Sequence, residues 1–152
     1  MAIETMLLAV GPSDRDRIDR LTEETLDVAG PTGAKVVVGH VFTRDEYEDA
    51  LEKLEFDRDI DDVSPDDVAG RHASVRDIAE RLDEADVDYE VRGAVGEHAD
   101  SIVELAEGVA ADRVIVGGRR RSPTGKAVFG STAQTVMLDA PCPVTFVRAG
   151  TK

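Results

Sequence analysis

Several residue types are scarce in this sequence. It contains one cysteine, no tryptophan, two tyrosines and four phenylalanines. The single cysteine, Cys142, excludes an internal disulfide. Its place between Pro141 and Pro143, without a neighbouring histidine or cation, favours a packed side chain over a nucleophile. No run reaches the ~18 apolar residues of a spanning helix, and the start lacks the pattern of a signal peptide, so we expect a cytoplasmic protein without a membrane partner.

Positive charge is also scarce. The net charge is −14, from 32 acidic and 18 basic residues, and aspartate outnumbers glutamate while arginine outnumbers lysine. An acidic surface repels nucleic-acid phosphates and anionic membranes, so nucleic acid is not an expected partner. The composition is typical of halophilic proteins that work in molar salt, where a Debye length of roughly 3 Å screens the self-repulsion. We therefore expect marginal stability in dilute buffer.

Short apolar runs alternate with stretches of helical periodicity along the chain. The runs are Thr5–Val10, Lys35–Phe42, Val87–Ala94, Arg113–Gly117 and Val144–Arg148. The strongest are continuous rather than alternating, as in strands of a parallel sheet that are buried on both faces. Between the runs, apolar residues recur every three or four positions, as in helices that lie on such a sheet. The sequence predicts one α/β domain over residues 1–152, with helices on both faces of a five-stranded parallel sheet.

Two local features qualify this pattern. Ser13 is expected to cap the first helix, and Gly30-Pro31 and Gly33 to end it. An acidic insert, about residues 44–67, follows the second run. Its first part, Glu46–Phe56, has the pattern of a solvated amphipathic helix, and Asp57–Asp67 is expected to be a loop. The insert is either a lid over a site or a plain acidic surface loop, and we favour the loop.

The most informative stretch covers residues 114–134. A β-branched run ends at Gly117-Gly118, a basic loop with one glycine follows, and Gly130-Ser131 opens a predicted helix. Unpaired N–H groups at a helix N-terminus suit a phosphate. In an open parallel sheet, ligands bind outside the carboxyl ends of the strands, where the strand order reverses. This predicts a crevice beside the ends of the first and fourth strands.

No catalytic constellation is visible. Gly125-Lys126 is not a Walker A motif, because the glycine and the hydroxyl residue of that motif are absent around it. Ser131 has no evident base partner, and with Gln134 it matches a capping box, which stabilises a helix without any ligand. The three histidines lie far apart in the sequence without the spacing of metal ligands. The sequence therefore predicts no catalytic residue and no metal site.

In these features the chain resembles the universal stress protein family over nearly its whole length. The residues that carry the resemblance are Ser13 after the first strand, Gly39-His40-Val41 in the second, Gly96 before a helix, Ala111-Asp112 before the fourth strand and Pro141-Cys142-Pro143-Val144 at the start of the last. The family signature Gly-x2-Gly-x9-Gly-Ser/Thr matches at Gly117 and Gly130-Ser131. The resemblance implies a doubly wound sheet of order 3-2-1-4-5, adenine nucleotide alpha-hydrolase-like in fold. It also implies a homodimer through the last strand, Val144–Arg148, which would otherwise be an unprotected edge.

Carried over by position, the resemblance implies an adenine nucleotide, ATP with Mg²⁺, in the crevice. It implies that the backbone of Val41 forms hydrogen bonds with adenine. It also implies that the rest of the nucleotide is contacted by Ala9, Val10, Gly11, Val116, Gly117, Gly130, Ser131 and Thr132. Two departures bear on this site. Arg120 replaces the second glycine of the signature and either fills the space for the phosphates or binds them. Gly11 stands where ATP-binding members usually carry an aspartate.

These observations favour a regulatory or protective module that binds ATP at the carboxyl ends of the first and fourth strands. Two alternatives remain open. In one, Arg120 occludes the crevice, and the protein is a dimeric stress-response interaction module without a nucleotide. In the other, the protein is an ATPase or phosphotransferase with Asp14 or Asp16 as its base, although both also suit a helix N-terminus. We expect at most slow ATP hydrolysis.

Overall fold

The computed structural model describes residues 3–53, 64–118 and 131–148 and contains one parallel sheet. Its order is β3-β2-β1-β4-β5. The strands are β1 (Thr5–Val10), β2 (Lys35–Phe42), β3 (Tyr89–Val95), β4 (Arg113–Gly118) and β5 (Val144–Arg148). The predicted fold class and strand order are confirmed. β3 begins two residues later than expected because the N–H of Val87 is donated to the carbonyl of Leu82 in the turn that ends the preceding helix.

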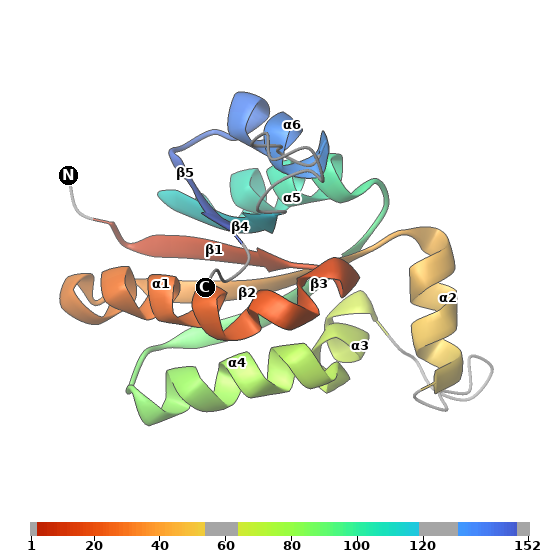
Figure 1. The fold of residues 1–152 in the computed structure, drawn as a ribbon, viewed down its shortest axis with the longest axis horizontal. Helices are drawn as coiled ribbons and strands as arrows, with labels where there is room; N and C mark the ends of the chain where they lie inside the picture. Colours follow the sequence, from red (N-terminus) through yellow and green to blue (C-terminus); the bar gives the residue numbers. More distant parts are fainter. Residues whose placement is uncertain (1–2, 54–63, 119–130, 149–152) are drawn as a thin grey trace, which may run out of the picture.

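Helices cover both faces of the sheet (Figure 1). They are the 3-10 helix η1 (Pro12–Arg17), α1 (Ile18–Thr32), α2 (Arg44–Lys53), α3 (Pro65–Arg71), α4 (Ala73–Glu84), α5 (His98–Gly108) and α6 (Ser131–Asp139). Apolar side chains of α1 and α4 form one buried cluster with the sheet, and those of α5 and α6 form another on the opposite face. The two clusters explain why the strongest apolar runs are continuous, since β1, β2 and β4 are buried on both sides.

The central strand β1 shows how the pleat divides its side chains. Met6 and Leu8 belong to the cluster beneath α1 and α4, whereas Leu7 and Ala9 belong to the cluster beneath α5 and α6. All four are at most 3% exposed. Cys142 packs against the second cluster, and burial raises the pKa of its thiol, as expected for a packed side chain.

The ends of the first helix differ from the expectation. The 3-10 helix η1 precedes α1, and its N-cap position is Gly11, whose N–H is donated to the Asp14 carboxylate. The residue before α1 itself is Arg17, and the predicted cap by Ser13 concerns a side chain outside the described part. At the other end, Gly30-Pro31 lie inside the helix, which ends only at Gly33 in the left-handed conformation, with φ 72°.

The acidic insert contains more helix than the sequence predicted. α2 begins at Arg44, two residues before the expected start, and its described part ends at Lys53. The prediction of a loop over Asp57–Asp67 is wrong for its last three residues, which belong to α3; residues 54–63 lie outside the described part. The Ser64 hydroxyl accepts from the Asp67 N–H and the Asp67 carboxylate accepts from the Ser64 N–H, so a reciprocal capping box starts α3.

The start of α3 lies directly against β3, one edge of the sheet. The Gly93 N–H is donated to the Asp66 carboxylate at 2.6 Å, so this backbone group of the edge strand is already bound. The two backbones approach so closely that a Cβ atom at Gly93 would lie 2.1 Å from the carbonyl oxygen of Pro65. Only glycine permits this contact.

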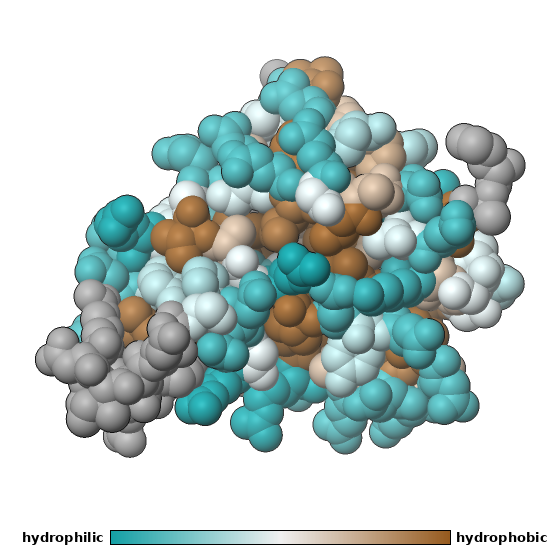
Figure 2. Space-filling view, turned by 180° about the vertical axis from the view of Figure 1, so that it is seen from behind, coloured by the Kyte–Doolittle hydropathy of each residue, from teal (hydrophilic) through white to brown (hydrophobic). Residues whose placement is uncertain are grey.

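Polar and apolar side chains are unevenly distributed over the surface. Seen from behind, hydrophilic residues dominate the periphery of the molecule, and apolar residues gather towards the middle of the face (Figure 2). None of the helices in the described ranges combines the length and the apolar character that crossing a bilayer requires.

We predict that Gly93→Ala destabilises the protein by about 2 kcal/mol or more, because the new methyl group must push the start of α3 away from β3. Chemical denaturation at constant KCl measures the change. Gly70→Ala is the matched control. It places a methyl group in open space within α3 and should stabilise the helix by about 0.5–1 kcal/mol. Equal stabilities of the two variants would contradict the close contact.

Candidate functional site

A pocket opens at the carboxyl edge of the sheet, where β1 and β4 pair side by side. After β1 the chain continues into η1 and α1 on one face, whereas α6 covers the other face. The pocket therefore lies at the point where the strand order reverses, as expected for ligand sites of this fold class. Its lining residues are Ala9, Val10, Gly11, Asp14, Val41, His98, Ile102, Val116, Gly117, Thr132 and Ala133.

Seven of the ten site residues predicted from the sequence line this one pocket. They are Ala9, Val10, Gly11, Val41, Val116, Gly117 and Thr132. Ser131 begins α6 beside them. Arg120 and Gly130 lie outside the described residues. That these residues bind a nucleotide stays a prediction, but β1, β2, β4 and α6 do bring most of them together.

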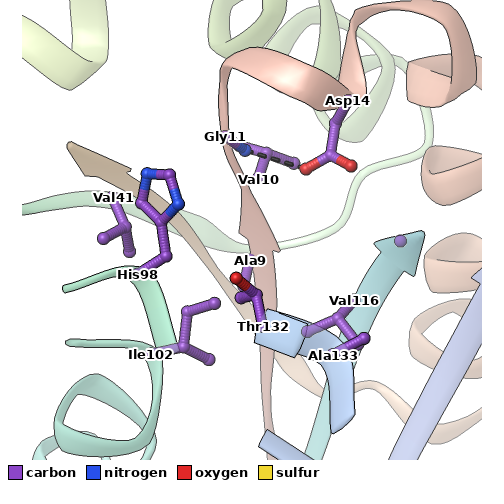
Figure 3. Close-up of a pocket in the computed structure, with 11 residues that line it drawn as sticks. Ala9, Val10, Gly11, Asp14, Val41, His98, Ile102, Val116, Thr132 and Ala133 are labelled. Atoms are coloured by element: carbon purple, nitrogen blue, oxygen red, sulfur yellow. Dashed lines mark hydrogen bonds between the residues drawn. The ribbon is translucent and has the colours of Figure 1, made fainter. Parts of the chain in front are cut away.

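The side of the pocket next to η1 holds a buried ion pair, which the sequence analysis did not identify. The Asp14 carboxylate lies 2.7 Å from Arg17 Nε, and its other oxygen accepts from the Gly11 N–H at 2.8 Å. Asp14 and Arg17 are only 7% and 8% exposed. Figure 3 shows Asp14 beside Gly11, with the dashed line marking their hydrogen bond. The i, i+3 spacing of an aspartate and an arginine in the first turn was the available signal.

This ion pair requires a glycine on β4. A Cβ atom at Gly117 would lie 2.6 Å from Arg17 Nε and 3.0 Å from Asp14 Oδ1. Gly117 thus lets the ion pair pack directly on the backbone of β4. Gly11 has a different environment, since a Cβ atom there would meet nothing within 4 Å.

The opposite side of the pocket is formed by Val41, His98 and Ile102 (Figure 3). His98 Nε2 lies 2.8 Å from the Glu46 carboxylate of α2. Glu46 is itself held by a capping box, in which its carboxylate accepts from the Thr43 N–H at 2.8 Å and its own N–H is donated to the Thr43 hydroxyl. The insert therefore fixes the orientation of His98, one of the three histidines to which the sequence assigned no role.

The electrostatics of Glu46 agree with this geometry. Burial, the largest single effect, would raise the pKa of the Glu46 carboxyl group. Together, the hydrogen bonds from the Thr43 N–H and from His98 outweigh the effect of burial, so the pKa of Glu46 lies below its ordinary value. Glu46 is therefore an ionised acceptor for His98 at neutral pH.

The pocket combines apolar walls with a few polar groups. Ala9, Ile102 and Val116 suit a flat apolar ring. The Asp14 carboxylate can accept from a hydroxyl group, and the Thr132 hydroxyl can donate to a phosphate. Thr132 lies in the first turn of α6, where N–H groups and the helix dipole favour an anion. Among the residues that the structure describes, no three or more histidine, cysteine or acidic side chains are grouped to hold a metal ion.

Comparisons with known proteins agree with the fold. The model of the universal stress protein family matches residues 2–148. A universal stress protein of Mycolicibacterium smegmatis is 33% identical over 79 residues, which are 51% of this chain and 61% of that protein. One of Thermus aquaticus, named for its place beside a sulfhydrylase, is 40% identical over 53 residues, 35% of this chain and 39% of that protein. The aligned segments thus span less than two thirds of both relatives.

Solved structures show the same fold. A universal stress protein in complex with cAMP matches with a TM-score of 0.61 at 22% identity, covering 99% of this chain and 100% of that one. A family member from Arabidopsis thaliana with AMP bound matches with a TM-score of 0.65 at 17% identity. The match covers 97% of this chain and 93% of that one. At such identities, the likeness establishes the fold alone.

We predict that Gly117→Ala destabilises the protein by about 1–3 kcal/mol, because the methyl group displaces the buried ion pair from β4. Gly11→Ala, whose methyl group meets open space, should stay within about 0.5 kcal/mol of the wild type. Denaturant titration of both variants at one KCl concentration gives the comparison.

A double-mutant cycle tests the cause of this effect. If overlap with the arginine is responsible, Gly117→Ala costs less in an Arg17→Ala background than in the wild type. The same cost in both backgrounds would show that the methyl group acts through another contact.

Proposed function

Because the chain belongs to the universal stress protein family, we propose that it binds an adenine nucleotide in this pocket and acts as a regulatory or protective module. The observation that carries the proposal is the convergence of four elements on one pocket. β1, β2, β4 and α6 each contribute residues at the positions that the family resemblance implies. The relatives solved with cAMP and AMP add support, since both ligands are adenine nucleotides.

In the proposed complex, adenine lies against Val41 and Ile102, and the backbone of Val41 provides its hydrogen bonds. Asp14 accepts a hydroxyl group of the ribose. The carboxylate of Asp14 is held towards the pocket by Gly11 and Arg17, so it takes the role of the aspartate that is missing at position 11. The phosphates lie at the N-terminus of α6 beside Thr132.

The finer part of the proposal is that the nucleotide is ATP with Mg²⁺. Mg²⁺ is commonly bound through substrate phosphates and one or two carboxylates, so it would enter with the nucleotide rather than occupy a site of its own. Asp14, the carboxylate of the described pocket lining, is already bound to Gly11 and Arg17, so the phosphates supply the ligands of the ion. Arg120 is proposed to bind the phosphates with its guanidinium group.

We predict saturable binding of ATP and AMP, and much weaker binding of GTP, by isothermal titration calorimetry in molar KCl. Thr132→Val removes one hydroxyl group near the phosphates and should weaken ATP and AMP about fivefold to tenfold. Adenosine, which lacks phosphate, should bind the variant and the wild type equally.

Thr135→Val is the matched control, because it makes the same change on α6 at a residue that does not line the pocket. It should bind all ligands like the wild type. If neither ATP nor AMP binds at millimolar concentration, the proposal is wrong. Binding that then appears in Arg120→Gly would support the alternative of an interaction module with an occluded crevice.

We further propose that two copies associate through β5. This strand forms the second edge of the sheet and pairs only with β4 in the described chain. Val144, Thr145 and Phe146 are half-buried on it. An edge strand of this kind pairs readily with its copy about a twofold axis.

We predict that Thr145→Asp shifts the protein from dimer towards monomer, because a carboxylate from each copy would be buried in the proposed contact between the two β5 strands. Light scattering after size exclusion measures the mass. Thr32→Asp, which adds the same charge at the exposed end of α1, should leave the mass unchanged. A wild-type protein that is monomeric at all concentrations would refute this contact.

A further inference from the structure

A second cavity of about 420 Å³ lies among β2, α2, η1, the end of α3 and the start of α4. It shares no lining residue with the pocket described above. The pleat of β2 explains the separation. Val41 lines the first pocket, whereas its neighbours His40 and Phe42 line the second cavity. The volume falls within the roughly 300–1,000 Å³ that is usual for small-molecule sites.

His40 is a fully buried polar residue in the wall of this cavity. It is 1% exposed, yet neither ring nitrogen has a hydrogen-bond partner among the described residues. Burial, and then the neighbouring His72, lower the pKa of His40 to about 3, so the ring is neutral at neutral pH. A neutral imidazole carries one donor and one acceptor, and both need a partner when they are buried. His40 thus offers both kinds of hydrogen bond to an occupant.

Aromatic rings surround this polar group. The rings of Phe42 and His72 each lie 4.3 Å from the ring of His40, centroid to centroid. His72 Nδ1 accepts from the Ser74 N–H at 3.3 Å, so in the neutral ring Nε2 carries the proton. Flat aromatic surfaces of this kind favour a planar ligand that stacks or packs edge-on.

Positive charge reaches the cavity from three exposed side chains, those of Arg15, Lys53 and Arg71. Of these, neither Arg15 nor Lys53 forms an ion pair with another residue of the described chain. After burial, the charges of Arg15 and Lys53 are the causes that lower the pKa of His72. Two carboxylates also line it. Asp49 is exposed, and Glu46 is already bound to Thr43 and His98.

We propose that this cavity binds a small organic anion with a planar, hydrogen-bonding ring, separately from the nucleotide pocket. The ring packs among the aromatic side chains and bonds to His40. The anionic group lies at the mouth, near Arg15 and Lys53. The ligand class follows from the volume, the unpartnered buried imidazole and the cations.

Three probes separate the features of this ligand. Nicotinate has a planar ring, a ring nitrogen and a carboxylate; nicotinamide lacks the charge, and benzoate lacks the ring nitrogen. We predict that nicotinate shifts the backbone amide signals of the cavity residues in ¹H–¹⁵N spectra, at the lowest KCl concentration that keeps the protein folded. Nicotinamide and benzoate should each bind roughly fivefold more weakly.

Substitutions test whether nicotinate binds in this cavity. Lys53→Ala should weaken nicotinate binding roughly fivefold but leave nicotinamide unchanged. Arg76→Ala, which removes an equal charge from α4 outside the cavity lining, is the matched control. Ala50→Phe should fill the cavity and abolish binding of all three probes, and its folded spectrum would show that the fold is retained.

The proposal is overturned by the absence of saturable shifts with nicotinate, by equal binding of nicotinate and nicotinamide, or by unchanged binding in a folded Ala50→Phe variant. Displacement of nicotinate by AMP without any effect of Lys53→Ala would also overturn it, because the probe would then lie in the nucleotide pocket. Binding of AMP itself is tested separately, so either proposal can fail alone.

Discussion

Both faces of a parallel sheet have to be covered, and this constraint governs the arrangement of the whole carboxyl edge. Each central strand sends alternate side chains into one of two apolar clusters. At the end of β2 the same alternation continues where the helices no longer cover the sheet completely. Val41 then faces one pocket, and His40 with Phe42 faces another cavity. Two separate spaces therefore arise from a single pleated strand.

In the pocket between β1 and β4, the geometry is set by the close approach of side chains to the backbone of β4. Gly117 leaves room for the Asp14–Arg17 ion pair, and the ion pair in turn fixes a carboxylate beside the pocket. Across the pocket, Glu46 holds His98 from outside the sheet layers. The walls of the pocket come from the core. Its two titratable groups, Asp14 and His98, are oriented by η1, which follows β1, and by α2, which follows β2. Changes in those segments alter the chemistry of the pocket without altering its walls.

The sequence predicted the sheet and most of the pocket because their signals are strong and local. Continuous β-branched runs mark strands that are buried on both sides, and the strand order then places Val10, Gly117 and Thr132 at one edge. The contacts of Asp14 with Arg17 and of Glu46 with His98 were missed. Their residue types also suit solvated helix ends, and only the packing shows which side chains turn inward. The start of α3 was missed because its proline and acidic residues resembled a loop, although Ser64 and Asp67 form a capping box.

The contact between α3 and β3 has a consequence for the number of chains in an assembly. Strand addition needs free backbone groups along an edge, and Asp66 with Pro65 occupies the β3 edge at Gly93. Within the described residues β5 pairs only with β4, so its edge is the one that we propose extends the sheet. A sheet that grows from one edge is complete once a single neighbour has joined, whereas a sheet open at both edges can polymerise. The side chain of one aspartate thereby favours a finite particle over a fibre.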